Sequence, residues 1–338
     1  MIMDPLVSIL IPAYNSEKWI ADTLRSVIGQ TWSRKEIVVV DDGSTDRTRD
    51  VAKSFESKTV RVISQPNRGA CAARNHAFAQ CQGDFIQWLD ADDLLAPDKI
   101  SQQLRRFEKD GDTHILYAAG WGTFYYRPSR ARVTPTYFWQ DLDPLDWLIY
   151  RMGSRQIWMH PSVWLVSRNV TERAGPWDER LLRNQDGEYF FRVVAESLLV
   201  KFVPESFGYY RKVNLGSVSS NYSEAAQASL CLAGESCVKR LLSIEDSNRT
   251  RGACIRQYQD ILSYLSPSVP HLIERIHRRI IKLGGTVEPV STCWRLSLLR
   301  RVVGGRKAAR RETIVERAKR RAAINYDKLL AKFFGTNL

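Results

Sequence analysis

The sequence lacks the glycine-rich turn that many nucleotide-binding folds place after their first strand. Residues 7–11 form a β-branched apolar run that predicts a strand, and Pro12, Ala13 and Tyr14 follow it. A helix is predicted to begin near Ser16. The turn therefore matches neither the dinucleotide-binding fingerprint nor a P-loop, both of which need glycine beside the phosphates. A nucleotide bound here must have its phosphate charge neutralised elsewhere.

Long hydrophobic runs are also missing. No apolar stretch approaches the roughly 20 residues of a membrane-spanning helix. The six cysteines show no paired metal-binding spacing, and no secretory signal precedes the first predicted strand. From these absences we expect reduced thiols in a cytoplasmic protein that does not span a membrane.

Acidic residues are scarce at the C-terminal end. From His271 onward there are seventeen lysines and arginines against five acidic residues, a net charge of +12, whereas the first 270 residues, with 33 basic and 32 acidic residues, are almost neutral. Trp294, Leu298 and Leu299 alternate with arginines there, which suits contact with anionic lipid on the inner face of a membrane. A solvated helical cap is the alternative. The segment has no recognisable nucleic-acid-binding motif, so no specific nucleic acid is expected.

The 338 residues, 44% of them hydrophobic, are enough for one large folded domain with an appendage. Apolar runs at residues 37–40, 60–64 and 85–89 alternate with amphipathic helical patterns. This alternation predicts an α/β fold with a doubly wound sheet. From residue 223 onward the pattern is helical.

An apolar strand pattern ends abruptly at Asp90, Asp92 and Asp93. Because ligands of open α/β sheets bind beyond the carboxyl ends of the strands, these carboxylates are expected to line a crevice. A hard divalent cation would offset their charge and take its remaining ligands from phosphate and water. The alternative is an acidic turn whose Asp92 and Asp93 assist the next helix N-terminus.

Several motifs occur together in the order and at the spacing of family-2 glycosyltransferases with the GT-A fold, which the chain resembles over about its first 215 residues. The motifs are VSILIPAYN (7–15), VDDGSTD (40–46), NRG (67–69), ARN (73–75) and LDADD (89–93). The resemblance implies a GT-A catalytic domain over residues 1–220, with a mixed doubly wound sheet, and a helical, basic C-terminal region over residues 221–338.

The resemblance also implies a nucleotide-sugar site. Asp92 would be the protein's metal ligand for Mn²⁺ or Mg²⁺ beside the donor diphosphate, and Asp90 and Asp93 would hold the ribose or sugar and the waters of the metal. Asp41 and the backbone of Pro12, Ala13 and Tyr14 would receive the base, and Arg68 would add positive charge.

A second acidic motif follows at residues 184–192, where the resemblance makes Asp186 the catalytic base. Gln185 replaces the Glu that usually precedes this Asp. Arg192, Trp177 and His160 are assigned to the acceptor side. Read from the residues alone, Asp186 is a helix-start residue favoured by the helix dipole.

The resemblance implies an enzyme that moves a sugar, with inversion, from a UDP-sugar to a hydroxyl of a glycan or lipid-linked acceptor in cell-surface polysaccharide synthesis. Two alternatives come from other classes. One is a nucleotidyltransferase of similar fold, which would carry a basic, glycine-rich phosphate turn after the first strand. The other is a non-catalytic protein that binds nucleic acid or membrane through its basic tail.

Overall fold

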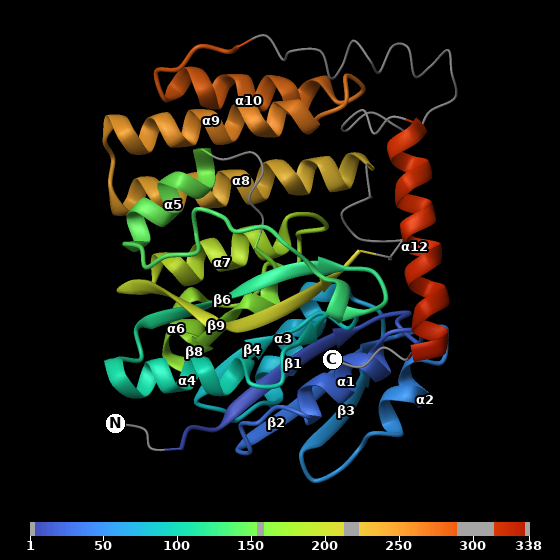
Figure 1. The fold of residues 1–338 in the computed structure, drawn as a ribbon. Coiled ribbons are helices and arrows are strands. Elements are labelled where there is room, and N and C mark those ends of the chain that lie inside the picture. Colours follow the sequence, from blue (N-terminus) through green and yellow to red (C-terminus); the bar gives the residue numbers. More distant parts are fainter. Residues whose placement is uncertain (1–3, 154–158, 213–222, 289–313, 335–338) are drawn as a thin grey trace.

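The computed structural model describes residues 4–153, 159–212, 223–288 and 314–334 (Figure 1). Within these residues, one sheet of nine strands forms the centre of the molecule. The strands are β1 (Val7–Ala13), β2 (Lys35–Asp42), β3 (Val60–Gln65), β4 (Phe85–Trp88), β5 (Leu94–Leu95), β6 (Ile115–Phe124), β7 (Arg132–Val133), β8 (Trp164–Ser167) and β9 (Leu199–Arg211).

The sheet is mixed, with the strand order β3-β2-β1-β4-β8-β6-β9-β5 and with β7 paired to β6. The four strands β3, β2, β1 and β4 run parallel, and β8 is antiparallel to both β4 and β6. The helices α1 (Ile20–Ile28), α2 (Thr48–Lys53) and α3 (Ala70–Gln80) connect the parallel strands. The predicted α/β class with a mixed, doubly wound sheet is confirmed.

Alternate residues of the parallel strands enter two separate cores. Leu10 and Val38 belong to one apolar cluster, whereas Ile9, Ile11 and Val39 belong to the other, and all five are buried. Because successive side chains of a strand point to opposite faces, this division shows that both faces of the sheet are covered. Burial on both faces explains why the strands read as continuous apolar runs in the sequence.

The remaining elements that precede residue 213 lie around this sheet. They are α4 (Lys99–Asp110), η1 (Pro128–Arg130), α5 (Pro144–Gly153), η2 (Pro161–Val163), α6 (Arg168–Ala174) and α7 (Gln185–Ala195). The helix α4 begins shortly after Pro97, and its apolar residues Ile100, Leu104 and Phe107 are buried.

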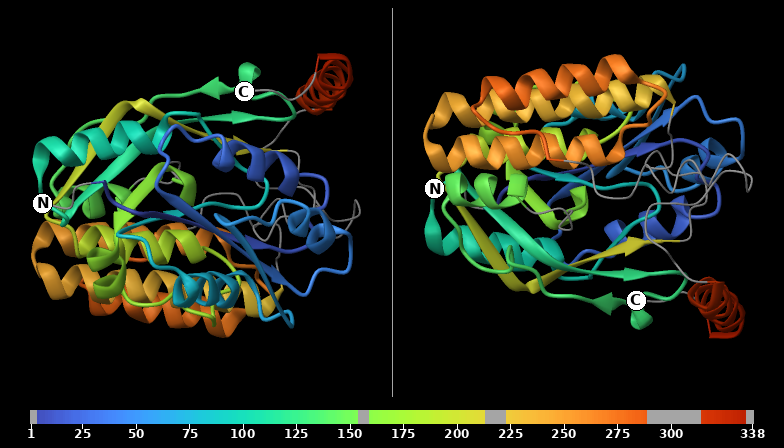
Figure 2. Two further views of the ribbon diagram at one scale, coloured as in Figure 1. Left: turned by 90° about the horizontal axis from the view of Figure 1, so that it is seen from below. Right: turned by 90° about the horizontal axis from the view of Figure 1, so that it is seen from above.

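Three C-terminal helices form a layer over α5 and α7: α8 (Glu224–Ile244), α9 (Asn248–Tyr264) and α10 (Pro270–Lys282) (Figures 1 and 2). Leu230, Cys237, Ile261 and Ile276 of these helices belong to the same apolar cluster as Leu10 of β1. The helical layer is therefore part of the main core. The predicted boundary between residues 220 and 221 lies outside the described residues.

The last helix, α12 (Ile314–Phe334), lies apart from this layer, on the opposite side of the sheet (Figure 2). The predicted lipid-facing residues Trp294, Leu298 and Leu299 lie outside the described part of the chain. Among the helices that the structure describes, none combines the length and the apolarity needed to cross a membrane.

Gly83 gives a direct test of how β1 and β4 pack. A Cβ at this position would lie 2.5 Å from Ser8 N and 2.9 Å from Leu6 O, both backbone atoms that cannot move aside cheaply. We expect Gly83→Ala to lower the free energy of unfolding by about 1–3 kcal/mol, as overpacking typically does. The matched control is Gly252→Ala in α9, where the nearest atom is a flexible arginine end at 3.5 Å.

The control should be neutral or stabilising by up to about 1 kcal/mol, because alanine favours a helix over glycine. Urea unfolding of both variants decides the matter. Equal stability of the two variants would contradict the packing described for the start of β4.

Candidate functional site

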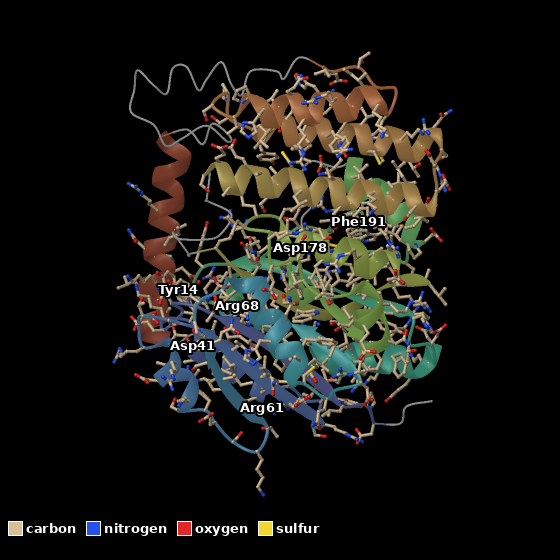
Figure 3. The ribbon with its side chains drawn as sticks, turned by 180° about the vertical axis from the view of Figure 1, so that it is seen from behind. Tyr14, Asp41, Arg61, Arg68, Asp178 and Phe191 are labelled. Carbon is tan, nitrogen blue, oxygen red and sulfur yellow. The ribbon has the colours of Figure 1, made fainter. Side chains whose placement is uncertain are left out.

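The carboxyl ends of β1, β2 and β4 meet at one edge of the sheet. In the strand register Ala13 lies beside Asp41, and Leu10 lies beside Trp88. Figure 3 shows Tyr14, Asp41 and Arg68 on this side of the molecule. The sequence-predicted donor residues therefore come from loops that share a single edge, as expected for parallel strands.

The loops after β1 and β2 are fastened to each other. Asn15, in the left-handed region at φ 47°, donates its backbone N–H to Ser44 Oγ at 3.0 Å and accepts from Thr45 N at 2.9 Å through its side chain. Asp46 accepts hydrogen bonds from the start of α2 and from Glu17 N. Tyr14 is left half exposed at the rim.

The neighbouring carboxylates Asp41 and Asp42 have different environments. Asp42 accepts from Gln65 Nε2 at 2.7 Å, Arg68 N at 2.9 Å and Gly69 N at 2.8 Å, and so fixes the loop after β3. Asp41 is 3% exposed, and its Oδ1 has no hydrogen-bond partner among the described residues. A buried acceptor without a donor is unfavourable, so this oxygen is suited to receive an N–H from a bound base.

The three carboxylates of the turn after β4 also differ. Asp93 is fully buried; its Oδ1 accepts from Arg211 N at 2.9 Å, and its Oδ2 lies 3.7 Å from His160 Nδ1. Burial raises the pKa of Asp93 well above its usual range, and the charges of Asp92 and Asp90 raise it further. Burial also lowers the pKa of His160 to about 3. Both shifts favour the neutral forms of the two groups, which weakens any ion pairing between them.

His160 and Asp93 therefore lie together in the interior. His160 Nδ1 is 2.5 Å from Ser162 Oγ, and its ring packs edge-on against Trp121 with centroids 5.3 Å apart. The predicted contacts of His160 with the acceptor and of Asp93 with the donor stay predictions. Complete burial favours a supporting position beneath the acidic turn for both residues.

Arg74 joins the two acidic motifs. Its Nη2 contacts Asp90 Oδ1 at 2.8 Å, its Nη1 donates to Gln185 Oε1 at 3.2 Å, and its Cζ lies 4.4 Å from the centre of the Trp177 ring. The Arg74 side chain is only 7% exposed. Because Gln185 directly precedes Asp186, the arginine sets the acidic turn against the start of α7.

The sequence analysis quoted Arg74 within a motif but gave it no role. A signal was present, because Arg74 is the one charged residue on the buried face of α3, where the other buried residues are Cys71, Ala72, Ala73 and Ala77. A buried guanidinium needs a nearby carboxylate, and this requirement points to a partner in an acidic motif.

The start of α7 is positioned by the C-terminal helices. Asn184 adopts a left-handed conformation at φ 56° and places Asp186 in the first turn. The backbone N–H groups of Leu182 and Arg183 donate to Ser229 Oγ of α8 at 2.8 and 3.0 Å. The region assigned to an appendage thus holds the loop that presents the predicted base.

The pKa of Tyr210, near the end of β9, is affected by the carboxylates of both acidic motifs. Burial raises the pKa of its phenol, and four carboxylates raise it further: those of Asp93, Asp92, Asp90 and Asp186. A single phenol responds to both acidic motifs only if both lie close to it. Asp92 and Asp186 are therefore both near enough to Tyr210 to affect its pKa.

Two other carboxylates near Asp186 are already engaged by arginines. Glu188 is buried and receives two hydrogen bonds from Arg192, both at 2.9 Å. Asp178 pairs with Arg180 at 2.7 Å, and this hydrogen bonding lowers its pKa. Both carboxylates therefore take part in ion pairs within the fold.

Trp177 and Arg192, both assigned to the acceptor side, are packed inside. The Trp177 ring stacks on Tyr189 with centroids 3.9 Å apart, and Arg192 Nη2 donates to Pro176 O at 2.9 Å. These contacts fix the turn before α7. Their predicted acceptor contacts stay predictions.

Arg68 is exposed but connected to the same turn. Its Nη2 contacts Glu179 Oε2 at 3.0 Å, and Asn75 donates to Glu179 Oε1 at 3.0 Å and accepts from Trp177 N at 2.8 Å. The loop after β3 and the helix α3 thus carry the segment that leads to Asp186.

The residues of the site could bind a divalent cation only if a bound phosphate and water supplied further oxygen ligands. Among the residues that the structure describes, no group of three or more His, Cys, Asp or Glu side chains could hold a metal ion. Asp93 is buried, whereas Asp90, which is paired with Arg74, and Asp92 are both partly exposed. One carboxylate with phosphate and water oxygens is a normal set for Mg²⁺ or Mn²⁺.

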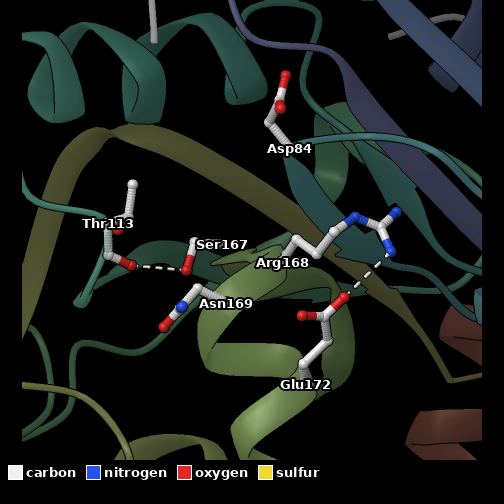
Figure 4. Close-up of a pocket in the computed structure, with 6 residues that line it drawn as sticks. All are labelled: Asp84, Thr113, Ser167, Arg168, Asn169 and Glu172. Carbon is white, nitrogen blue, oxygen red and sulfur yellow. Dashed lines mark hydrogen bonds and ion pairs between the residues drawn. The ribbon is translucent and has the colours of Figure 1, made fainter. Parts of the chain in front are cut away.

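A cavity of about 280 Å³ lies elsewhere, beside the amino end of β4 (Figure 4). Asp84, Thr113, Ser167 and Arg168 contribute to its lining. Asp84 Oδ2 accepts from Leu6 N at 2.8 Å, and Ser167 Oγ donates to Thr113 O at 2.6 Å, so these groups serve the fold. The cavity is not part of the site formed by the acidic motifs.

Comparison with known proteins identifies the segment that carries the first acidic motif. The sequence model of glycosyl transferase family 2 matches residues 8–160. Residues 8–160 belong to glycosyl transferase family 2. The family-2 segment includes the loops after β1, β2 and β4 but ends before Asp186. The contacts of Arg74 connect it to the second motif.

Named relatives support the same family. The putative teichuronic acid biosynthesis glycosyltransferase TuaG of Bacillus subtilis is 42% identical over 103 residues, which are 30% of this chain and 41% of TuaG. The uncharacterised glycosyltransferase EpsJ of Bacillus subtilis is 31% identical over 224 residues, 62% of each protein. The chain thus spans less than two thirds of either relative.

The GT-A fold is shared with a solved structure. TarS 1–349 of S. aureus, in complex with UDP-GlcNAc, superposes with a TM-score of 0.61 over 86% of this chain and 92% of that one, at 17% identity. The predicted GT-A architecture is confirmed.

Variants of the two neighbouring aspartates of β2, Asp41 and Asp42, should affect UDP binding and stability differently. Asp42→Ala removes three hydrogen bonds, so we expect the free energy of unfolding to fall by about 2–3 kcal/mol at roughly 1 kcal/mol each. Asp41→Ala should leave stability nearly unchanged, because Asp41 Oδ1 has no partner in the described structure, and should weaken UDP binding.

Urea unfolding and UDP calorimetry on both variants measure these effects. Wild-type UDP affinity in Asp41→Ala would remove Asp41 from the base site.

Proposed function

We propose that this protein transfers a sugar from a UDP-sugar to a hydroxyl group of a glycan or lipid-linked acceptor, with inversion at the anomeric carbon, in cell-surface polysaccharide synthesis. The main observation in support is that Arg74 connects the acidic turn to the start of α7. Its Nη2 lies 2.8 Å from Asp90 Oδ1, and its Nη1 lies 3.2 Å from Gln185 Oε1. The family-2 segment supports the reaction class. The similarity to TuaG, a putative teichuronic acid biosynthesis glycosyltransferase, supports the pathway class, and the TarS complex with UDP-GlcNAc supports a UDP-sugar donor.

The donor half of the proposed site is the sheet edge. Asp41 accepts a hydrogen bond from the base, and the backbone of Pro12, Ala13 and Tyr14 borders it. Asp92 would hold the divalent cation, Mn²⁺ or Mg²⁺, which would neutralise negative charge on the diphosphate. Stabilising that developing charge lowers the barrier to breaking the bond to the sugar.

The acceptor half is the start of α7. Asp186 takes the proton from the acceptor hydroxyl at a carboxylate oxygen, while that hydroxyl attacks the anomeric carbon from the face opposite the leaving diphosphate. One displacement with one base inverts the configuration and requires no covalent intermediate. The hydrogen bonds of Ser229 to Leu182 N and Arg183 N keep the base in position during this step.

Acceptor-dependent release of UDP tests this function, and two variants separate the roles within it. Asp186→Asn keeps the side-chain shape but cannot accept a proton, so we expect kcat to fall about 10²–10⁴-fold with little change in donor affinity. Asp92→Asn, by contrast, should weaken Mn²⁺-dependent UDP binding. Both variants should melt like the wild type, because asparagine keeps the size and shape of the aspartate side chain.

Near wild-type turnover in Asp186→Asn would make this residue structural. Unchanged metal-dependent UDP affinity in Asp92→Asn, by calorimetry, would remove the metal assignment.

We further propose that the basic tail attaches the enzyme to the inner, cytoplasmic face of a membrane. The net charge of +12 from His271 onward supports this. So does the outward side of α12, where Tyr326 is 62% exposed and Leu329 is 52% exposed, with Arg321 and Lys328 also exposed. Apolar side chains between basic ones are typical of helices that lie at an anionic lipid surface.

Liposomes containing anionic lipid test the attachment. Each basic residue near such a surface contributes about 1 kcal/mol, and the attraction fades within a Debye length of roughly 3 Å at 1 M salt. We expect the full chain to bind at low salt, to dissociate at high salt, and to bind far better than a chain that ends at Gly285. Equal partitioning of the two chains would refute the proposal.

A further inference from the structure

The turn after β6, residues 125–127, contacts both sides of the donor site. Its Tyr126 ring packs against Trp19, in the loop that follows β1, with centroids 5.6 Å apart. Its Tyr125 carbonyl accepts from Arg211 Nη1 at 3.4 Å. Arg211 in turn donates through Nε to Asp92 O at 2.8 Å. The turn therefore contacts the loop after β1 through the Tyr126 ring, and it is connected to the acidic turn through Arg211.

Arg211 is the centre of this arrangement. Its guanidinium is buried, with Cζ 4.5 Å from the centre of the Trp19 ring and 4.6 Å from that of Phe124. Its backbone N–H also donates to Asp93 Oδ1 at 2.9 Å. An arginine held between two aromatic faces has little freedom, so movement of the turn is passed on to the acidic residues.

Helix α12 fixes this turn through one carboxylate. Asp327 Oδ2 accepts from Tyr126 N at 2.9 Å and from Arg127 N at 3.1 Å, while Asp327 Oδ1 accepts from Arg127 Nε at 2.8 Å. Asp327 is only 7% exposed. Hydrogen bonds to an ionised group are the stronger kind, and here three of them converge on a residue about 200 positions away in the sequence.

The sequence around Asp327 makes the contact specific. From Arg317 to the end of the chain, Asp327 is the only acidic residue, whereas Arg320, Arg321 and Lys328 are nearby basic ones. A helix that served only as a basic surface would gain from a neutral or basic residue at this position. The acid is explained by the three donors that it binds.

We propose that Asp327 is a positioning residue for the donor site: by holding the turn at residues 125–127, helix α12 keeps Arg211, the loop after β1 and the acidic turn in their binding arrangement. The inference rests on the proposed function for its consequence in catalysis. It assigns part of the donor site to the C-terminal helix, beyond the family-2 segment.

Loss of this support is expected to affect donor binding more than the chemical step. The contacts of this turn lead to Trp19, Asp92 and Asp93, whereas the loop before Asp186 is held by Ser229 of α8. Loss of the Asp327 carboxylate should therefore weaken donor binding and leave the chemical step largely intact. A role limited to overall stability would not separate KM from kcat in this way.

The full-length chain with Asp327→Ala tests the proposal, with Asn325→Ala, an exposed residue of the same helix, as the matched control. We expect the Kd for UDP with Mn²⁺, by calorimetry, and the donor KM to rise on the order of tenfold in Asp327→Ala, as loss of a charge-assisted contact predicts. We expect less than a twofold change in kcat, and both values near wild type in Asn325→Ala.

Two further variants keep the test sharp if Asp327→Ala folds poorly. Arg127→Ala leaves both backbone hydrogen bonds to Asp327 in place, and Asp327→Asn keeps an acceptor oxygen for them. Both should lose less UDP affinity than Asp327→Ala, and thermal melts monitored by circular dichroism should show all variants folded at the assay temperature. The same affinity in all four variants as in the wild type would overturn the proposal, as would a loss of kcat at constant KM.

Hydrogen exchange without nucleotide separates this inference from the proposed function. Asp327→Ala should speed exchange in peptides that cover residues 16–20 and 90–95, relative to Asn325→Ala. Faster exchange there with no UDP binding by the wild type would support the coupling and overturn the proposed function. Unchanged exchange in these peptides would overturn the coupling even if the wild type binds UDP.

Discussion

The ion pair between Arg74 and Asp90 is the contact on which the geometry of the site depends. With its side chain 7% exposed, Arg74 has left water almost completely, and such a charge is tolerable only beside an opposite charge with its hydrogen bonds satisfied. Asp90 supplies that charge, Gln185 accepts a further N–H group, and Trp177 covers the guanidinium. Because one buried cation contacts all three, separating the acidic turn from the start of α7 would cost Arg74 either its carboxylate or its contacts with Gln185 and Trp177.

The C-terminal region is built into the same arrangement. Ser229 of α8 holds the loop before Asp186, and Asp327 of α12 holds the turn that contacts Arg211. Helices that follow the family-2 segment thus support both halves of the site from two sides of the sheet (Figure 2). The basic surface and the support of the site are separate properties of the same segment, and they depend on different faces of α12.

Local pattern was sufficient to predict the parallel strands, the helix α4 and the edge where the carboxylates gather. It was not sufficient for β9, whose half-buried residues alternate irregularly and which pairs with β6 in parallel and β5 in antiparallel fashion. It also missed the contacts between residues far apart in sequence, such as Arg74 with Gln185 and Arg211 with Asp93. The separate environments of Asp90, Asp92 and Asp93 follow from such contacts, so three adjacent acids that look equivalent in the sequence differ in the fold.

The central claim is that the sheet edge formed by the loops after β1, β2 and β4 binds the nucleotide. Hydrogen exchange of the wild-type protein with and without UDP and Mn²⁺ tests it most directly. The account predicts slower exchange in peptides covering residues 12–19, 41–46 and 90–95, with no change near Asp84 and Arg168, which line the cavity at the amino end of β4. Protection confined to that cavity, with the three loops unchanged, would contradict it.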